Sequence, residues 1–175
     1  MVWSHAGVVA VQLPEAREID TRRRIYQAHP EAREQRPPFN SELAIEGIAA
    51  VLHGDAVDLG ETVLDMSDVP AFNRRVYELV RSIPRGETRT YEQIAKGVGV
   101  SGALHSVAQA LARNPFMVIV PCHRVLEAAG AADKASQNGG VISKRRLLGI
   151  EGTRLSATKT LLDVLLPLDP PRPRP

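Results

Sequence analysis

A short apolar run at residues 116–120 ends at Pro121 and is followed at once by the only cysteine of the chain. The run predicts a buried strand, and the proline predicts a bend that presents Cys122. A free cysteine is often a small buried hydrophobe. Here the basic neighbours His123 and Arg124 favour a nucleophile, because such groups lower the pKa of a thiol. Neighbours on a strand point to opposite faces, so we expect a water or a turn to connect the imidazole to the sulfur.

The length of 175 residues and the hydrophobic content of 43% allow a buried core in one compact unit or two small domains. No stretch approaches the roughly 20 apolar residues of a membrane span. Residues 1–12 lack the pattern of a secretory signal. A single cysteine excludes internal disulfides, and no zinc-ligand spacing is present. We therefore expect a reduced, cytoplasmic protein without a metal, another cofactor or a membrane partner.

The charges of the chain are unevenly distributed, although the formal net charge is only +2. Residues 55–68 are acidic, whereas basic side chains gather between residues 74 and 146. This distribution favours docking on phosphates. Ordinary solvated helix faces would give the same composition, so charge by itself leaves nucleic-acid binding open.

Residues 1–70 predict a small N-terminal α/β domain in which no catalytic motif is visible. Its expected elements are a strand over residues 7–13, a charged helix over 14–29, a polar connector over 31–39, a helix that Ser41 caps and Gly54 ends, and a short strand over 62–66. The proline at position 70 marks the expected exit from this domain.

Residues 71–155 predict a mostly helical domain that contains a candidate helix-turn-helix. Its expected elements are a helix from Phe72 to Ile83, a helix over 91–96 that Thr90 and Gln93 start as a capping box, a glycine-rich turn over 97–102 and a second helix over 103–112. Small residues on the second helix suit a narrow minor groove, and they suit tight helix packing equally well. Residues 156–175 predict a last helix and a disordered, proline-rich tail.

Several motifs of the second half together resemble the O6-alkylguanine-DNA alkyltransferase family. The most specific is Pro121-Cys122-His123-Arg124, which stands behind Asn114-Pro115 and the apolar run. The likeness extends from Phe72 to Gly152 and includes Ile83-Pro84-Arg85-Gly86-Glu87-Thr88 and Lys144-Arg145-Arg146-Leu147-Leu148-Gly149-Ile150-Glu151-Gly152. It implies an α+β fold: a small ribonuclease-H-like N-terminal α/β domain, then a mostly helical C-terminal domain with a winged-helix-like helix-turn-helix and the active-site cysteine.

The resemblance implies stoichiometric repair of double-stranded DNA that carries O6-alkylguanine. The enzyme flips the damaged guanine out of the duplex and transfers its alkyl group irreversibly to Cys122. His123 would withdraw the thiol proton through a water, and Glu151 would hold the imidazole in the right tautomer. Asn114 would brace the bend, and Tyr91 would donate a proton to the departing guanine. We also expect the protein to be a monomer.

The resemblance also predicts which residues bind DNA or the flipped guanine. They are His105, Ser106, Leu111, Arg113, Arg124, Val125, Ala135 and Ser136. Two of them depart from the family pattern, which has an arginine where this chain has His105 and an aromatic residue where it has Ala135. A histidine is shorter than an arginine, and loss of a ring removes on the order of 1–3 kcal/mol of base stacking. We expect weaker base extrusion and a wider, more polar pocket.

Three other functions stay open from the residues. A divergent alkyltransferase-like protein would bind alkylated DNA with weak or no transfer, although relatives of that kind replace the cysteine. A Cys–His hydrolase would turn over and would need an oxyanion hole. A plain helix-turn-helix regulator would leave Cys122 inert.

Overall fold

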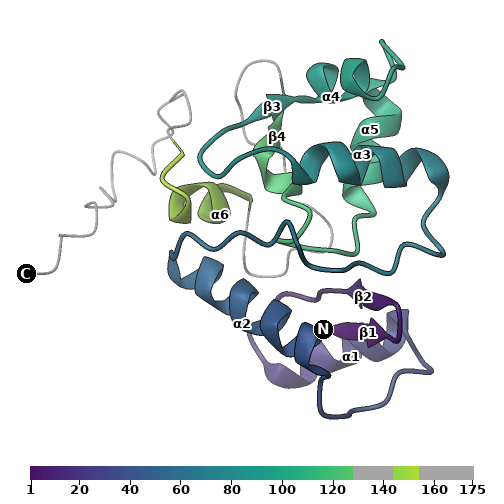
Figure 1. Cartoon of the computed structure of the whole chain (residues 1–175), viewed down its shortest axis with the longest axis vertical. Coiled ribbons are helices and arrows are strands. Elements are labelled where there is room, and N and C mark those ends of the chain that lie inside the picture. Colours follow the sequence, from purple (N-terminus) through teal and green to yellow (C-terminus); the bar gives the residue numbers. More distant parts are fainter. Residues whose placement is uncertain (128–143, 154–175) are drawn as a thin grey trace, which may run out of the picture.

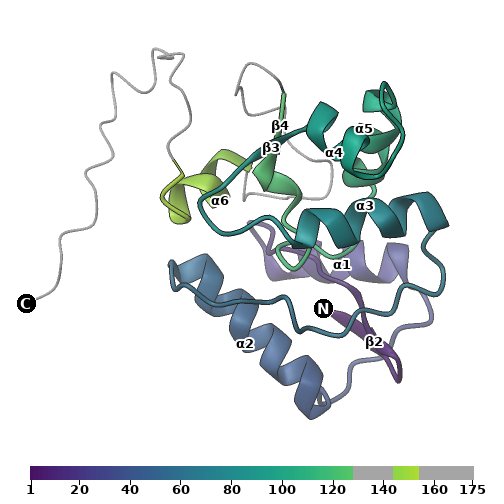
Figure 2. The ribbon, with the colours of Figure 1, turned by 45° about the horizontal axis from the view of Figure 1, so that its top comes forward.

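The computed structural model describes residues 1–127 and 144–153 and has a mixed α+β fold. Its elements in chain order are β1 (Val2–Ser4), β2 (Gly7–Ala10), α1 (Glu18–Ala28), α2 (Phe39–His53), α3 (Ala71–Arg81), β3 (Arg89–Thr90), α4 (Tyr91–Gly97), α5 (Leu104–Ala112), the 3-10 helix η1 (Cys122–Arg124), β4 (Val125–Leu126) and α6 (Lys144–Ile150). In Figures 1 and 2, β1, β2, α1 and α2 lie at one end of the molecule, and α3, α4 and α5 lie at the other. None of the described helices is long and apolar enough to cross a membrane. The helix and tail predicted over residues 156–175 lie outside the described part.

The first region, residues 1–70, is built on a hairpin. β1 pairs antiparallel with β2, and the strand predicted over residues 7–13 is confirmed only as far as Ala10. The strand predicted over residues 62–66 reduces to a single parallel bridge, in which the Val8 amide donates to the Val63 carbonyl at 2.9 Å. At this bridge Gly7 lies against the same carbonyl, and a Cβ would sit only 2.6 Å from it. The close approach of the two segments therefore requires glycine.

The two long helices of the first region match their predictions apart from where they start. α1 is shorter than the predicted helix over residues 14–29. α2 ends at Gly54 in the left-handed conformation (φ 105°), as predicted. Ser41 is not its cap, however, because α2 already begins at Phe39 and Ser41 lies buried in its first turn. The extended backbone of Pro38 ends the connector and starts the helix three residues earlier than predicted.

The helices predicted on either side of a glycine-rich turn are present as α4 and α5, and α3 packs against both. The predicted capping box is confirmed: the Gln93 amide donates to the Thr90 hydroxyl at 3.2 Å, and the Thr90 amide donates to the Gln93 side chain at 2.7 Å. Gly99 and Gly102 have φ angles of 78° and 87°, which only glycine adopts without strain. They turn the chain between the two helices.

The apolar run at residues 116–120 is not a strand, and that prediction is wrong. The Val120 amide donates to the Phe116 carbonyl at 2.8 Å, so the run folds into a tight loop. Val118 within it has a φ of 74°, a strained conformation for a β-branched residue that persists only where the surroundings hold it. All five side chains are buried. The continuous apolarity thus reflects burial on every side of a loop, which periodicity cannot distinguish from a buried strand.

One hydrophobic core runs through the first region and the second region, residues 71–127 and 144–153, and holds this loop. Tyr77 of α3 meets Phe116 edge-on, with 6.1 Å between the ring centroids, and its hydroxyl donates to the Ala110 carbonyl of α5 at 2.8 Å. The short parallel ladder between β3 and β4 adds a second connection. It places Tyr91, the first residue of α4, next to the segment that follows Cys122.

Candidate active site

Cys122 opens η1 and is buried, with 4% of its surface exposed. Burial raises the pKa of the thiol above its ordinary value. A hydrogen bond from the Asn114 side chain, the charge of Lys144 and the backbone amides of Cys122 and His123 oppose this rise. The prediction that basic neighbours lower the thiol pKa is therefore wrong for the free protein. The thiol rests in its neutral form, surrounded by groups that stabilise the thiolate once the proton leaves.

Asn114 holds the loop in front of the cysteine and is completely buried. Its side-chain amide donates to the Val120 carbonyl at 3.0 Å, and its side-chain carbonyl accepts the Phe116 amide at 2.9 Å. One side chain thereby ties together both ends of the strained loop. The same side chain reaches the Cys122 sulfur, so the position of the sulfur depends on Asn114.

His123 and Glu151 form a buried pair, with 2.8 Å between Nε2 and Oε1. Because an ionised carboxylate only accepts hydrogen bonds, Nε2 carries a proton and Nδ1 of the neutral ring is the basic nitrogen. Nδ1 is buried and has no hydrogen-bond partner among the described residues. Burial lowers the pKa of His123, and this effect outweighs the opposing pull of Glu151. The imidazole is therefore neutral and able to take up a proton.

Arg124 is the second partner of Glu151. Its Nε donates to Oε2 at 3.0 Å and its Nη2 donates to Oε1 at 2.7 Å, while Nη1 donates to the Ile83 carbonyl at 2.5 Å. Burial raises the pKa of Glu151, but the hydrogen bonds and charges of His123 and Arg124 outweigh it and lower the value to about 2. Glu151 is thus an ionised carboxylate held from two sides.

Three residues predicted to contact DNA or substrate have their side chains inside the protein. The Arg124 side chain is 15% exposed and is engaged by Glu151. Leu111 and Val125 belong to the hydrophobic core, with 4% and 0% of their surfaces exposed. The amphipathic pattern of α5 explains Leu111, because this residue lies on the same buried stripe as Val107.

Three other predicted contact residues are exposed on α5 or directly after it. His105 and Ser106 lie in its first turn, and Arg113 follows its last residue. The His105 ring is hydrogen-bonded to the Gln109 side chain, with 2.9 Å between the two Nε2 atoms. The helix therefore presents polar side chains outward, away from the side that packs on α3 and α4. The remaining predicted pair, Ala135 and Ser136, lies outside the described residues.

Lys144 is a site residue that we did not single out from the sequence. Its ammonium group donates to the Tyr91 hydroxyl at 3.2 Å and to the Val125 carbonyl at 2.7 Å, and it lies 5.4 Å from the centre of the Tyr91 ring. Its charge also favours the thiolate of Cys122. Two sequence signals point to Lys144: it opens the family motif over residues 144–152, and it starts a basic run, which is equally typical of a solvated face.

The arrangement combines a nucleophile with a base and an orienting carboxylate. Cys122 supplies the sulfur, His123 a neutral imidazole, and Glu151 the charge that stabilises the imidazolium after proton transfer. Tyr91 with Lys144 places a second proton donor beside the same segment. Within residues 1–127 and 144–153, no three His, Cys, Asp or Glu side chains are grouped to hold a metal ion.

Comparison with known proteins gives one consistent family. Residues 71–153 match the sequence pattern of the 6-O-methylguanine DNA methyltransferase DNA-binding domain. A methylated-DNA–protein-cysteine methyltransferase of Methanothermobacter thermautotrophicus is 37% identical over 155 residues, which cover 89% of this chain and 80% of that protein.

Two crystal structures have a similar fold. Mycobacterium tuberculosis OGT in complex with DNA is 37% identical, with a TM-score of 0.56 over 62% of this chain and 65% of that one. The O6-methylguanine-DNA methyltransferase of Pyrococcus kodakaraensis is 22% identical, with a TM-score of 0.62 over 86% of this chain and 89% of that one. The latter likeness supports the fold alone.

Proposed function

Because the chain belongs to the family of methylated-DNA–protein-cysteine methyltransferases, we propose that it repairs DNA by moving an O6-alkyl group from guanine to Cys122. The sulfur attacks the alkyl carbon, a carbon–sulfur bond forms, and the bond from that carbon to guanine O6 breaks. The electron pair of the broken bond stays with guanine, which takes up a proton. No step restores the thiol, so each molecule reacts once.

The proton of Cys122 goes to His123 in this proposal. The free nitrogen is Nδ1, since Nε2 is engaged by Glu151 at 2.8 Å, and we propose that a water connects Nδ1 to the sulfur. Glu151, with a pKa of about 2, stays ionised and stabilises the imidazolium that forms. The backbone amides at the start of η1 and the Asn114 side chain stabilise the thiolate.

Tyr91 supplies the proton that the departing guanine needs. The ammonium group of Lys144 donates a hydrogen bond to the phenolic oxygen at 3.2 Å, and a charge-assisted hydrogen bond of this kind stabilises the oxygen after it has given up its proton. Lys144 thus supports Tyr91 as a donor while it also favours the thiolate of Cys122. One cation serves both proton transfers.

DNA binding falls to the face that α5 presents. We assign α4 and α5 to a winged-helix-like helix-turn-helix and residues 1–70 to a ribonuclease-H-like accessory domain. His105, Ser106 and Arg113 would contact the duplex, and the damaged guanine would flip out of it. Flipping follows from the burial of the sulfur, because a stacked base cannot bring its O6 substituent to an atom inside the protein. The complex of Mycobacterium tuberculosis OGT with DNA supports DNA binding as such. We propose a cytoplasmic monomer.

The proposal rests on one observation: Asn114, Cys122, His123 and Glu151 are all buried in a chain of this family. The test is intact-protein and peptide mass spectrometry after incubation with a duplex that contains O6-methylguanine. We expect one added methyl group on Cys122, with one guanine restored for each protein molecule. Cys122→Ser is the control and should bind the duplex without gaining mass. Binding by the wild type without any gain in mass would contradict the proposal.

A second candidate is a divergent alkyltransferase-like protein that binds alkylated DNA and transfers weakly. It is favoured by His105, which stands where the family has arginine and is hydrogen-bonded to Gln109 on its own helix. The same experiment distinguishes the two by the rate at which the methyl group is gained.

A further inference from the structure

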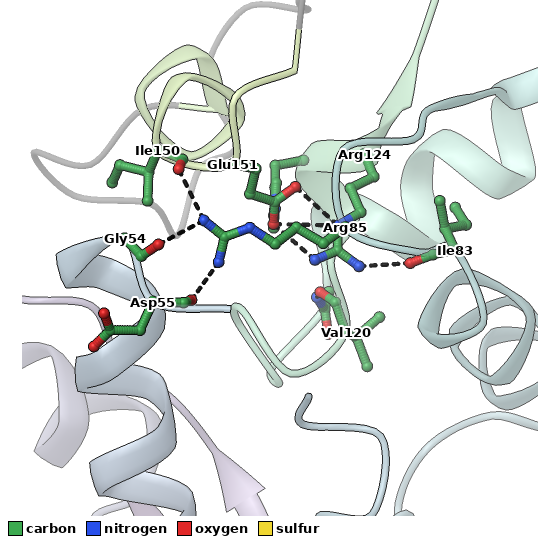
Figure 3. Close-up of polar contacts among 10 residues, drawn as sticks. Gly54, Asp55, Ile83, Arg85, Val120, Arg124, Ile150 and Glu151 are labelled. Atoms are coloured by element: carbon green, nitrogen blue, oxygen red, sulfur yellow. Dashed lines mark hydrogen bonds and ion pairs between the residues drawn. The ribbon is translucent and has the colours of Figure 1, made fainter. Parts of the chain in front are cut away.

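Arg85 lies where the first region meets the active-site segment, in the loop that follows α3 (Figure 3). Its Nη2 donates to the Gly54 carbonyl at 2.7 Å and to the Ile150 carbonyl at 3.0 Å, and its Nη1 donates to the Asp55 carbonyl. One guanidinium group therefore joins three segments that are far apart in sequence: the end of α2, the loop after α3 and the end of α6.

The charge of Arg85 suits this position. Gly54 caps the C-terminus of α2, and Ile150 is the last residue of α6. The last carbonyls of a helix have no partner within it and carry the negative end of its dipole, so a cation is favourable there. Here a single cation faces the C-terminal ends of two helices. The planar, five-donor group of arginine can engage several carbonyls at once, which lysine does less well.

The bond to Ile150 acts directly on the site. The Ile150 carbonyl belongs to the peptide that leads into Glu151, so its hydrogen bond fixes the backbone from which the carboxylate extends. The loop after α3, which carries Arg85, also contacts the site through Arg124. Arg124 donates to the Ile83 carbonyl of this loop and also binds the Glu151 carboxylate. Figure 3 shows the two arginines on either side of Glu151. Arg124 fixes the carboxylate, and Arg85 fixes its backbone.

We propose that Arg85 is a positioning residue that joins the first region to the active site and holds Glu151 in register with His123. It touches no reacting atom and acts through Glu151. The effect on transfer rests on the function proposed above, whereas the effect on the His123–Glu151 hydrogen bond does not. Loosening the end of α2 would then weaken the hydrogen bond between His123 and Glu151, although the proposed reaction uses no group from residues 1–70.

Arg81 provides a matched control. Its guanidinium also donates to backbone carbonyls of the first region, those of Leu59, Gly60 and Thr62, with 2.9 Å to Thr62. It thus ties the two regions together in the same way, but within the described residues it makes no hydrogen bond to α6 or Glu151. Arg81→Ala should lower stability without a specific effect on the His123–Glu151 pair.

The first experiment is a double-mutant cycle on single-turnover transfer to an O6-methylguanine duplex. Arg85→Ala should slow transfer by about tenfold in the wild type and by less than about twofold in the Glu151→Gln background, since residues that act together are not additive. Arg81→Ala should have the same effect in both backgrounds. Equal slowing by Arg85→Ala in both backgrounds, or no slowing in an active wild type, would overturn the proposal.

The second experiment does not use the reaction. The NMR signal of the His123 Nε2 proton reports its hydrogen bond to Glu151, and we expect Arg85→Ala to shift or broaden it while Arg81→Ala leaves it unchanged. Arg85→Lys, which keeps the charge but loses the planar fork, should give an intermediate shift and covers the case in which the alanine variant does not fold. An unchanged signal in both Arg85 variants would overturn the proposal, even if the protein transferred no alkyl group.

Discussion

The two regions of the molecule use charged side chains in opposite ways. In the first region, Arg22 pairs with Glu18 and Glu34 at the surface, and the three side chains are 49%, 78% and 61% exposed. In the second region, Glu151 is buried between His123 and Arg124. Exposed ion pairs contribute about 0–1 kcal/mol, whereas loss of one partner from a buried pair costs roughly 3–5 kcal/mol. We infer from this difference that the buried charges of the second region matter for both chemistry and stability, whereas the surface pairs of the first region matter for neither.

The largest expected effect comes from Glu151→Ala. It leaves the Arg124 guanidinium without its carboxylate and His123 without its orienting partner. We expect a loss of about 3–5 kcal/mol in the free energy of unfolding and a fall in the transfer rate of about 100-fold or more. Urea unfolding and single-turnover kinetics measure the two effects. A stability loss below about 1 kcal/mol would place this pair with the surface pairs of the first region.

Asn114→Ala should have the next largest effect. It removes the partners of the Phe116 amide and the Val120 carbonyl, and each unpaired buried group costs about 1–3 kcal/mol. The strained loop then loses its brace and the sulfur its hydrogen bond, so transfer should slow as well. The variant Asn114→Asp keeps an acceptor for the Phe116 amide, but it buries a carboxylate that faces the Val120 carbonyl, so it should be no more stable than Asn114→Ala near neutral pH. Thermal unfolding of both variants checks the order, and a more stable Asn114→Asp would contradict it.

Acid should also distinguish the regions. Hydrogen bonds from Ser4 and Ser67 lower the pKa of Asp65 in the first region to about 2, and Glu151 reaches about 2 despite its burial. A lowered carboxyl pKa gives stability that is present above the ordinary value, 4.5 for Glu151, and is lost as the pH falls towards 2. The melting temperature of the wild type should fall as the pH is lowered. Because Asp65 is near solvent, Glu151→Gln should reduce this fall more than Asp65→Asn does. A larger reduction of this fall in Asp65→Asn than in Glu151→Gln would contradict the prediction.

Replacement of His105 by arginine sharpens the comparison at the face of α5 that we propose binds DNA. His105→Arg introduces the arginine, and Ala135→Tyr the aromatic residue, that the family pattern predicts at these two positions. We expect each to raise the transfer rate by about tenfold, the factor that corresponds to 1.4 kcal/mol. Single-turnover kinetics with O6-methylguanine and O6-benzylguanine measure the gain and the width of the pocket. No gain from either change would show that these departures from the family pattern do not limit the protein.

The smallest effect is expected from Arg22→Ala in the first region. The exposed partners Glu18 and Glu34 remain solvated when the arginine is removed, so the urea unfolding midpoint and the transfer rate should both stay unchanged. Urea unfolding beside Glu151→Ala provides the direct contrast. A loss as large as that of Glu151→Ala would remove the distinction between the regions.

Local features were predictable from the sequence. The capping box of Thr90 and Gln93 and the end of α2 at Gly54 depend on residues within one helical turn, and both are confirmed. The strand predicted at residues 116–120 is wrong because an apolar run indicates burial but not conformation. Lys144 and Arg85 were not assigned a function, because their partners Tyr91 and Ile150 lie 53 and 65 residues away.

The sequence by itself determined which groups are available: one thiol, a histidine and an arginine beside it, and a distant Glu151 in a family motif. Only the tertiary structure decided their charge states and partners. It buries Cys122 so that its thiol is neutral, and it brings His123 and Arg124 onto a carboxylate 28 and 27 residues away. The physical reason is that a pKa depends on burial and on nearby charges in space, and neither is fixed by neighbours along the chain.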